Sequence, residues 1–115
     1  MKLRPLDRLT ALRRRGEPPL TTAINVEEIH RGVRPTERGA ACQLFDGIRV
    51  AAIGRTEGAR AGDWRREYAS RGVTLAQADC LVAAVAVSLG MPLATGNPKD
   101  FPMAEVELEH WQVGA

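Results

Sequence analysis

The sequence predicts an α/β fold in which helices flank a mainly parallel central sheet. Short apolar runs alternate with segments of helical periodicity, which is typical of strands joined by crossover helices. Hydrophobic residues make up 44% of the chain, but only 4% of residues are aromatic, so the core must be aliphatic. A chain of 115 residues is long enough for one small domain, which we expect over 1–115.

The first half of the chain is expected to contain three helices and two strands. Leucines recur at helical spacing in the opening segment, at Leu3, Leu6, Leu9 and Leu12. They predict an amphipathic helix that ends at Gly16. A short strand over 20–22 leads into a helix over 22–31, and a third helix begins at Pro35. The apolar residues of 48–53 predict a buried strand.

The second half repeats the alternation of helices and strands. A helix is expected to begin at Thr56, which can cap it, and to bury a stripe formed by Ala61, Trp64 and Tyr68. The next helix, capped by Thr74 and ended by Gly90, is apolar on most of its circumference. The run 91–95 predicts a strand, and alternating glutamates over 105–110 predict another, half-buried one.

One carboxylate, Asp79, lies in the first turn of this apolar helix. A carboxylate that is buried with its helix is costly unless it is paired or bound to a cation, which favours a metal site. The alternative is an acid that interacts favourably with the positive end of the helix dipole. The spacing of the residues is compatible with both interpretations.

Two motifs in this sequence resemble one known family: one motif is made of residues 78–84 and 94–101, and the other is residues 20–32. Residues 78–84 read Ala-Asp-Cys-Leu-Val-Ala-Ala, and residues 94–101 read Ala-Thr-Gly-Asn-Pro-Lys-Asp-Phe. Upstream, residues 20–32 read Leu-Thr-Thr-Ala-Ile-Asn-Val-Glu-Glu-Ile-His-Arg-Gly and end in Glu-Ile-x-x-Gly. In this order and at this separation, the motifs resemble those of PIN-domain ribonucleases, specifically the VapC toxins of type II toxin–antitoxin systems.

The resemblance implies a PIN-like sandwich and a Mg²⁺-dependent endoribonuclease that hydrolyses RNA phosphodiester bonds as the toxin of such a system. Mn²⁺ is expected to substitute for Mg²⁺. The implied partners are RNA, a cognate VapB-like antitoxin and a second copy of the chain in a homodimer. Cys42 and Cys80 lack metal-ligand spacing and are expected to be reduced thiols. The chain shows no apolar run of membrane-spanning length and no signal-peptide core, so we expect a cytoplasmic protein.

The same resemblance implies three acidic site residues. Asp79 would be a direct metal ligand, Glu28 a ligand or a base that positions water, and Asp100 would hold an outer ligand or a second metal. Carboxylates that share a cleft raise one another's pKa unless a cation neutralises them, and their oxygens suit Mg²⁺ or Mn²⁺. Glu27 lies about 100° around the helix from Glu28 and is expected at the surface.

Further polar residues are expected around these acids. Asn97 would orient the site through its amide, Thr95 would support the acids by hydrogen bonding, and Lys99 would neutralise RNA phosphate. His30 is expected to be a surface or supporting residue rather than a general base. The triplet of arginines at 13–15 is expected to be a solvated helix end.

The chain departs from the family pattern at its start. PIN domains of this kind normally begin with a strand that carries Asp in an Asp-x-(Ser/Thr) motif, whereas the early acid here, Asp7, lies in an amphipathic helix. We therefore expect a domain that is truncated at its N-terminus. An alternative function is then a catalytically impaired PIN-like fragment that only binds an antitoxin or RNA. A third interpretation is a generic α/β domain whose acids are caps and solvated faces.

Overall fold

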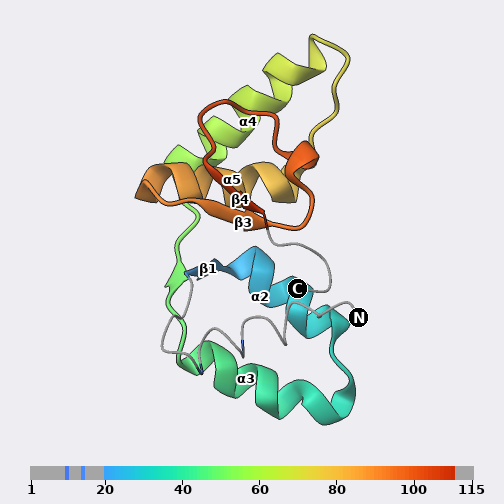
Figure 1. The fold of residues 1–115 in the computed structure, drawn as a ribbon, viewed down its shortest axis with the longest axis vertical. Helices are drawn as coiled ribbons and strands as arrows, with labels where there is room; N and C mark the ends of the chain where they lie inside the picture. The colour runs from blue at the N-terminus through green and yellow to red at the C-terminus, as the bar shows by residue number, and fades with distance from the viewer. Residues whose placement is uncertain (1–9, 11–13, 15–19, 111–115) are drawn as a thin grey trace. The chain divides into compact units, whose positions relative to one another are not determined.

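The structure, a computed structural model, describes residues 10, 14 and 20–110 (Figure 1). The predicted opening helix lies outside these residues apart from Thr10 and Arg14, which are helical. The described residues form two compact units, one up to Ala52 and the other from Ile53, and each is considered by itself. The single domain expected over 1–115 stays a prediction.

The first unit combines two helices with one pair of parallel strands. Its elements are β1 (Thr21–Thr22), α2 (Ala23–Gly32), the 3₁₀ turn η1 (Pro35–Glu37), α3 (Arg38–Asp46) and β2 (Val50–Ala51). Thr22 begins α2 through a capping box: its side chain accepts the Asn25 N–H at 3.4 Å, and the Asn25 side chain accepts the Thr22 N–H at 3.2 Å. Thr21 pairs with Val50, and Thr22 pairs with Ala51.

The core of the first unit is smaller than the sequence predicts. α3 buries Ala41 and Leu44, three residues apart on one helix face, whereas the neighbouring Ala40 is exposed. The strand that was expected to be buried over 48–53 is only two residues long, and Val50 within it is 45% exposed. In β2, Ala51 is buried and Val50 faces out, because successive side chains of a strand point to opposite faces.

The second unit packs two long helices together with a second pair of parallel strands. Its elements are α4 (Arg55–Ala69), α5 (Gln77–Leu89), β3 (Leu93–Thr95), the 3₁₀ turn η2 (Pro98–Asp100) and β4 (Leu108–His110). Leu93 pairs with Leu108, and Thr95 pairs with His110. The core consists of Ala61, Trp64, Leu75, Cys80, Ala83, Ala84, Phe101, Met103 and Val106. This core holds α5 in place and so fixes the backbone that carries Asp79.

Two helices of this unit begin differently from the prediction. The helix expected from Thr56 is capped at Gly54, because the Glu57 carboxylate accepts the Gly54 N–H at 2.7 Å. α5 was expected to be capped by Thr74, but it begins three residues later without a side-chain cap. The buried Leu75 lies between Thr74 and the helix, in a segment that is not helical.

The α/β class and the parallel pairing of the strands are confirmed, with one parallel pair in each unit. Gly90 ends α5 in the left-handed conformation with φ of 64°, as a C-terminal glycine is expected to do. The N–H of Met91 then bonds to the carbonyl of Ala86 at 3.0 Å. Among the described helices, none is both long and apolar enough to span a membrane.

Candidate active site

Asp79 occupies the third position of α5, and its side chain is partly buried. Burial raises the pKa of the Asp79 carboxyl, and the negative charge of Asp100 raises it further. Both effects disfavour the ionised form in the protein alone. The charge of Asp100 therefore reaches Asp79, and a cation bound there would favour the ionised carboxylate.

Asp100 lies at the end of η2, in the loop that follows the carboxyl end of β3. Local hydrogen bonds shape this loop. The Thr95 hydroxyl accepts the Asn97 N–H at 3.0 Å, and the Asn97 carbonyl accepts the Asp100 N–H at 3.0 Å. Lys99 and Asp100 are both exposed. Loops at the carboxyl ends of parallel strands are the usual place for ligands in α/β folds.

The adjacent acids of α2 differ from each other. Glu27 pairs with Arg31 at 2.6 Å, and its side chain is 58% exposed, so its expected surface position is confirmed. Glu28 is also exposed, and its charge acts on Arg31 as well. Glu28 belongs to the first unit, whereas Asp79 and Asp100 belong to the second. That these three acids act together stays a prediction.

The donor chemistry of Asp79 and Asp100 fits a hard divalent cation. Both side chains offer carboxylate oxygens, the ligands that Mg²⁺ and Mn²⁺ prefer. Within neither unit do the described residues bring together three His, Cys, Asp or Glu side chains that could hold a metal. Two protein carboxylates are nevertheless a common Mg²⁺ arrangement, because this ion keeps several of its waters.

The two cysteines are free thiols, as the sequence predicts. Cys80 follows Asp79 in the chain, but its side chain is fully buried in the core of the second unit. Burial raises the pKa of the Cys80 thiol, which therefore stays neutral, with an added contribution from the Asp79 charge and an opposing one from Arg65. A neutral, buried thiol packs as a small apolar residue rather than acting as a ligand.

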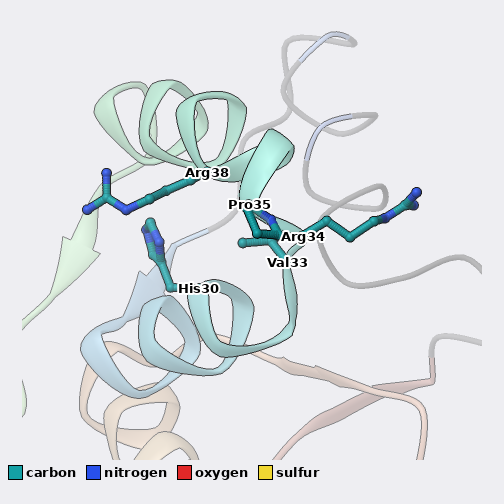
Figure 2. A pocket seen from close by; sticks show the side chains of 5 residues that line it. All are labelled: His30, Val33, Arg34, Pro35 and Arg38. Atoms are coloured by element: carbon teal, nitrogen blue, oxygen red, sulfur yellow. The ribbon is translucent and has the colours of Figure 1, made fainter.

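A basic pocket lies in the first unit, between α2 and α3 (Figure 2). It is lined by His30, Val33, Arg34, Pro35 and Arg38. The His30 ring stacks on Phe45 with their centroids 6.0 Å apart, which agrees with a packing role rather than with a general base. Figure 2 shows the Arg34 and Arg38 side chains pointing in opposite directions, so they do not converge on one ligand.

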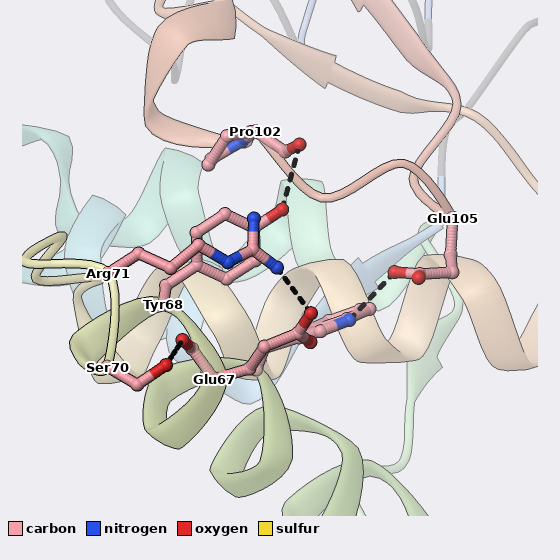
Figure 3. A network of polar contacts seen from close by, with 7 residues as sticks. Glu67, Tyr68, Ser70, Arg71, Pro102 and Glu105 are labelled. Carbon is pink, nitrogen blue, oxygen red and sulfur yellow. Dashed lines mark hydrogen bonds and ion pairs between the residues drawn. The ribbon is translucent and has the colours of Figure 1, made fainter.

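Two aromatic residues of α4 contact the segment that follows Asp100 (Figure 3). The Tyr68 hydroxyl donates to the carbonyl of Pro102 at 3.1 Å, and the Trp64 indole Nε1 donates to Oε2 of Glu105 at 2.8 Å. The sequence placed Tyr68 and Trp64 on a buried stripe but did not connect them with the site. The signal that could have done so is chemical: a buried Tyr or Trp usually needs a partner for its polar group.

The sequence profile of the PIN domain family matches residues 4–106, so the chain belongs to this family. Within the family it is similar to VapC proteins. It is 32% identical over 99 residues to Ribonuclease VapC10 of Mycobacterium tuberculosis strains H37Rv and CDC 1551, an alignment that covers 86% of this chain and 74% of the relative.

Solved structures of VapBC assemblies share the fold. VapBC-1 from nontypeable Haemophilus influenzae matches with a TM-score of 0.71 and 22% identity, over 90% of this chain and 85% of that one. DNA-bound VapBC from Salmonella typhimurium matches with a TM-score of 0.70 and 18% identity, over 94% and 86%. VapBC2 from Rickettsia felis, bound to a promoter DNA fragment, matches with a TM-score of 0.69 and 19% identity, over 91% and 83%. The PIN-like fold predicted from the sequence is therefore confirmed.

Proposed function

We propose that the chain is a Mg²⁺-dependent endoribonuclease, the toxin of a toxin–antitoxin pair, which hydrolyses RNA phosphodiester bonds. The observation that carries the proposal is the partly buried Asp79, whose pKa is raised by burial and by the charge of Asp100. Perturbed carboxyls of this kind are typical of functional sites. The support for RNA as the substrate is the 32% identity to a protein named as a ribonuclease.

The roles of the acidic residues follow from their chemistry. Asp79 is the direct ligand of the cation, Asp100 holds an outer ligand or a second cation, and Glu28 is a ligand or a base that orients the attacking water. A bound Mg²⁺ would lower the pKa of a coordinated water and stabilise the charge of the leaving oxygen. Mn²⁺ replaces it with the same oxygen ligands.

The polar residues of the loop after β3 complete the proposed site. Thr95 holds the loop through its hydrogen bond to the Asn97 N–H. Asn97 orients the site through its amide. The exposed Lys99 neutralises a phosphate of the RNA backbone, which contributes affinity without sequence specificity.

The proposed partners follow from the relatives. The three similar structures are VapBC assemblies, which supports binding of this chain to a VapB-like antitoxin. We also place a homodimer and a cytoplasmic location in the proposal. Copurification with a coexpressed VapB-like antitoxin tests antitoxin binding, and light scattering of the purified chain tests the homodimer.

Calorimetric titration with Mn²⁺ and an RNA cleavage assay test the proposed activity. The unmodified chain is expected to bind Mn²⁺ and to lose cleavage on chelation, and Asp79→Ala is expected to lose both binding and cleavage. Cleavage that persists in Asp79→Ala contradicts the proposal, since it indicates a contaminating nuclease.

The neighbouring acids of α2 provide a matched pair of variants. Glu28→Gln is expected to weaken Mn²⁺ binding by about tenfold or more, the range found when supporting groups of a metal site are lost. Glu27→Gln is expected to leave the affinity unchanged, because Glu27 is exposed and already pairs with Arg31. Equal effects of the two variants would mean that Glu28 acts only through the general negative charge of the helix.

A second candidate function is binding of an antitoxin or RNA without catalysis. The observation that favours it is that neither unit, over the residues described, gathers three potential metal ligands. Tight binding of the antitoxin by a chain with no Mn²⁺ affinity would support this function. Mg²⁺-dependent turnover of RNA by the purified chain would exclude it.

A further inference from the structure

Asp100 is exposed, but the segment that follows it returns to the core of the second unit. Phe101, Met103 and Val106 are all buried, with Met103 only 2% exposed. The 3₁₀ turn that ends at Asp100 is closed by local bonds only, from the Asp100 N–H to Asn97 and from the Phe101 N–H to Pro98. These bonds fix the shape of the turn, but its position within the second unit depends on how the next residues are anchored.

α4 supplies two hydrogen bonds to this next segment. The Tyr68 hydroxyl donates to the Pro102 carbonyl, two residues beyond Asp100, and the Trp64 indole donates to the Glu105 carboxylate. Trp64 and Tyr68 are four residues apart and so lie on one face of the helix. Figure 3 shows the Tyr68 hydroxyl directed at Pro102, and Figure 1 shows the segment between β3 and β4 crossing α4. The two contacts therefore come from one face of α4.

Each of the two donor rings also contacts a guanidinium group. The Arg71 guanidinium lies 4.6 Å from the centroid of the Tyr68 ring and pairs with Glu67. The Arg60 guanidinium lies 5.7 Å from the centroid of the Trp64 ring, which is 4% exposed. Contacts of this kind attract the cation to the face of the ring.

We propose that Tyr68 and Trp64 are positioning residues, whose hydrogen bonds from α4 fix the position of the Asp100 carboxylate relative to Asp79. This inference rests on the proposed function, because it assigns the two aromatic residues to the same cation site. In this role neither side chain would contact the cation or the RNA. They act through the backbone at Pro102 and the side chain of Glu105. A metal site depends strongly on the groups that orient its ligands, so the loss of such a bond weakens cation binding.

The test compares Tyr68→Phe with a control in the same unit. Tyr68→Phe removes one hydroxyl and keeps the ring that packs in the core. The control, Ser88→Ala, also removes one hydroxyl, which donates to Oε2 of Glu57 at 2.9 Å and so joins α5 to α4. Mn²⁺ titration calorimetry, thermal melting in EDTA, and kcat and KM for RNA cleavage are measured on the full chain with each variant.

Tyr68→Phe is expected to weaken Mn²⁺ binding by about tenfold and to lower kcat at low Mn²⁺ by a similar factor, as loss of an orienting group typically does. KM for RNA stays within about twofold, and raised Mn²⁺ restores much of kcat, because a displaced ligand weakens occupancy rather than RNA contact. Ser88→Ala keeps both the Mn²⁺ affinity and kcat. Trp64→Phe, which keeps a large ring but removes the N–H, is expected to act in the same direction as Tyr68→Phe.

Three results would overturn the inference. The first is a Tyr68→Phe chain with unchanged Mn²⁺ affinity and unchanged kcat. The second is a chain that melts earlier but binds Mn²⁺ as tightly as the unmodified chain, because this means that the bond only stabilises the unit. The third is an unmodified chain that binds no Mn²⁺, which overturns the proposed function together with the inference and is thereby distinguished from the first two.

Discussion

The two pairs of acids in this chain lie in contrasting surroundings. Glu27 and Glu28 are exposed on α2 of the first unit, and Arg31 neutralises Glu27 through a surface ion pair. Asp79 and Asp100 come from α5 and the loop after β3 in the second unit. There, burial and mutual repulsion raise the pKa of Asp79. Glu27 of the first pair is paired with an arginine, whereas the surroundings of Asp79 in the second pair disfavour its charge.

This contrast shows how an acid of a functional site can be distinguished from an acid that is only solvated at the protein surface. An exposed Glu–Arg pair on a helix contributes little to stability in either direction. A partly buried carboxylate in an apolar helix beside a second carboxylate lowers stability, and its presence is understandable if a cation offsets the cost. The contrast therefore predicts that Asp79 and Asp100 lower the stability of the chain in the absence of a cation and serve its function when a cation is bound.

The largest expected effect is that of Asp79→Asn, which keeps the shape of the side chain and removes its charge. Mn²⁺ binding and RNA cleavage are expected to fall below detection, because a direct ligand is lost. In EDTA at pH 7, the variant is expected to melt at a higher temperature than the unmodified chain, because the disfavoured charge is gone. Calorimetry and thermal melting on the same preparations measure both changes.

Glu28→Gln provides the comparison for this variant. Its side chain is exposed in the first unit, so no gain in melting temperature is expected in EDTA. A lower melting temperature of Asp79→Asn would break the comparison between the two pairs. It would mean that the ionised Asp79 carboxylate stabilises the first turn of α5 through the helix dipole more than its burial costs.

The next effect concerns pH and follows from the direction of the Asp79 shift. The pKa of Asp79 is higher in the folded chain than in the unfolded chain, so between these values the folded chain binds a proton that the unfolded chain does not. The contribution of this group to stability therefore rises as pH falls through the folded pKa, and it becomes constant below the ordinary value. In EDTA, the advantage of Asp79→Asn in melting temperature is expected to shrink as pH is lowered from 7 to 4.

The same titration affects metal binding in the opposite sense. A proton on Asp79 competes with the cation, so Mn²⁺ affinity is expected to fall as pH is lowered over this window. Melting curves and Mn²⁺ titrations at several pH values measure both trends. An advantage of Asp79→Asn that stays constant with pH would show that its origin is packing rather than charge.

Part of this contrast can be predicted from the sequence alone. The apolar run around Asp79 and the glycine at position 90 define a helix with a carboxylate near its start, and the structure has both features. The surface position of Glu27 follows from the helical angle between neighbours. Periodicity and end signals are local properties, so they are readable without knowledge of the fold.

Other features depend on contacts between segments far apart in the chain. The bond from Tyr68 to Pro102 spans 34 residues, and periodicity identifies the buried face of a helix but not its partner. Thr74 has the chemistry of a cap, yet the buried Leu75 intervenes before the helix begins. The grouping of Glu28 with Asp79 rests on family resemblance and stays a prediction, since these residues lie in different units.

The smallest expected effect separates stability from the site itself. Gly90 ends α5 with φ of 64°, a conformation that costs a residue with a Cβ about 1 kcal/mol. Gly90→Ala is therefore expected to lower the melting temperature by about 4 °C or more. Mn²⁺ affinity is expected to stay unchanged, because Asp79 lies at the opposite end of the helix.

Gly32→Ala is the matched substitution in the first unit. Gly32 is the last residue of α2, its φ is not positive, and an added Cβ would meet nothing within 4 Å. Its replacement is expected to stabilise the chain by about 0.4–1 kcal/mol, because the unfolded state loses freedom. If Gly90→Ala instead weakened Mn²⁺ binding while Gly32→Ala did not, the position of Asp79 would depend on the whole length of α5. Cation binding would then depend on the stability of the whole second unit, and not only on the first turn of α5 and the loop after β3.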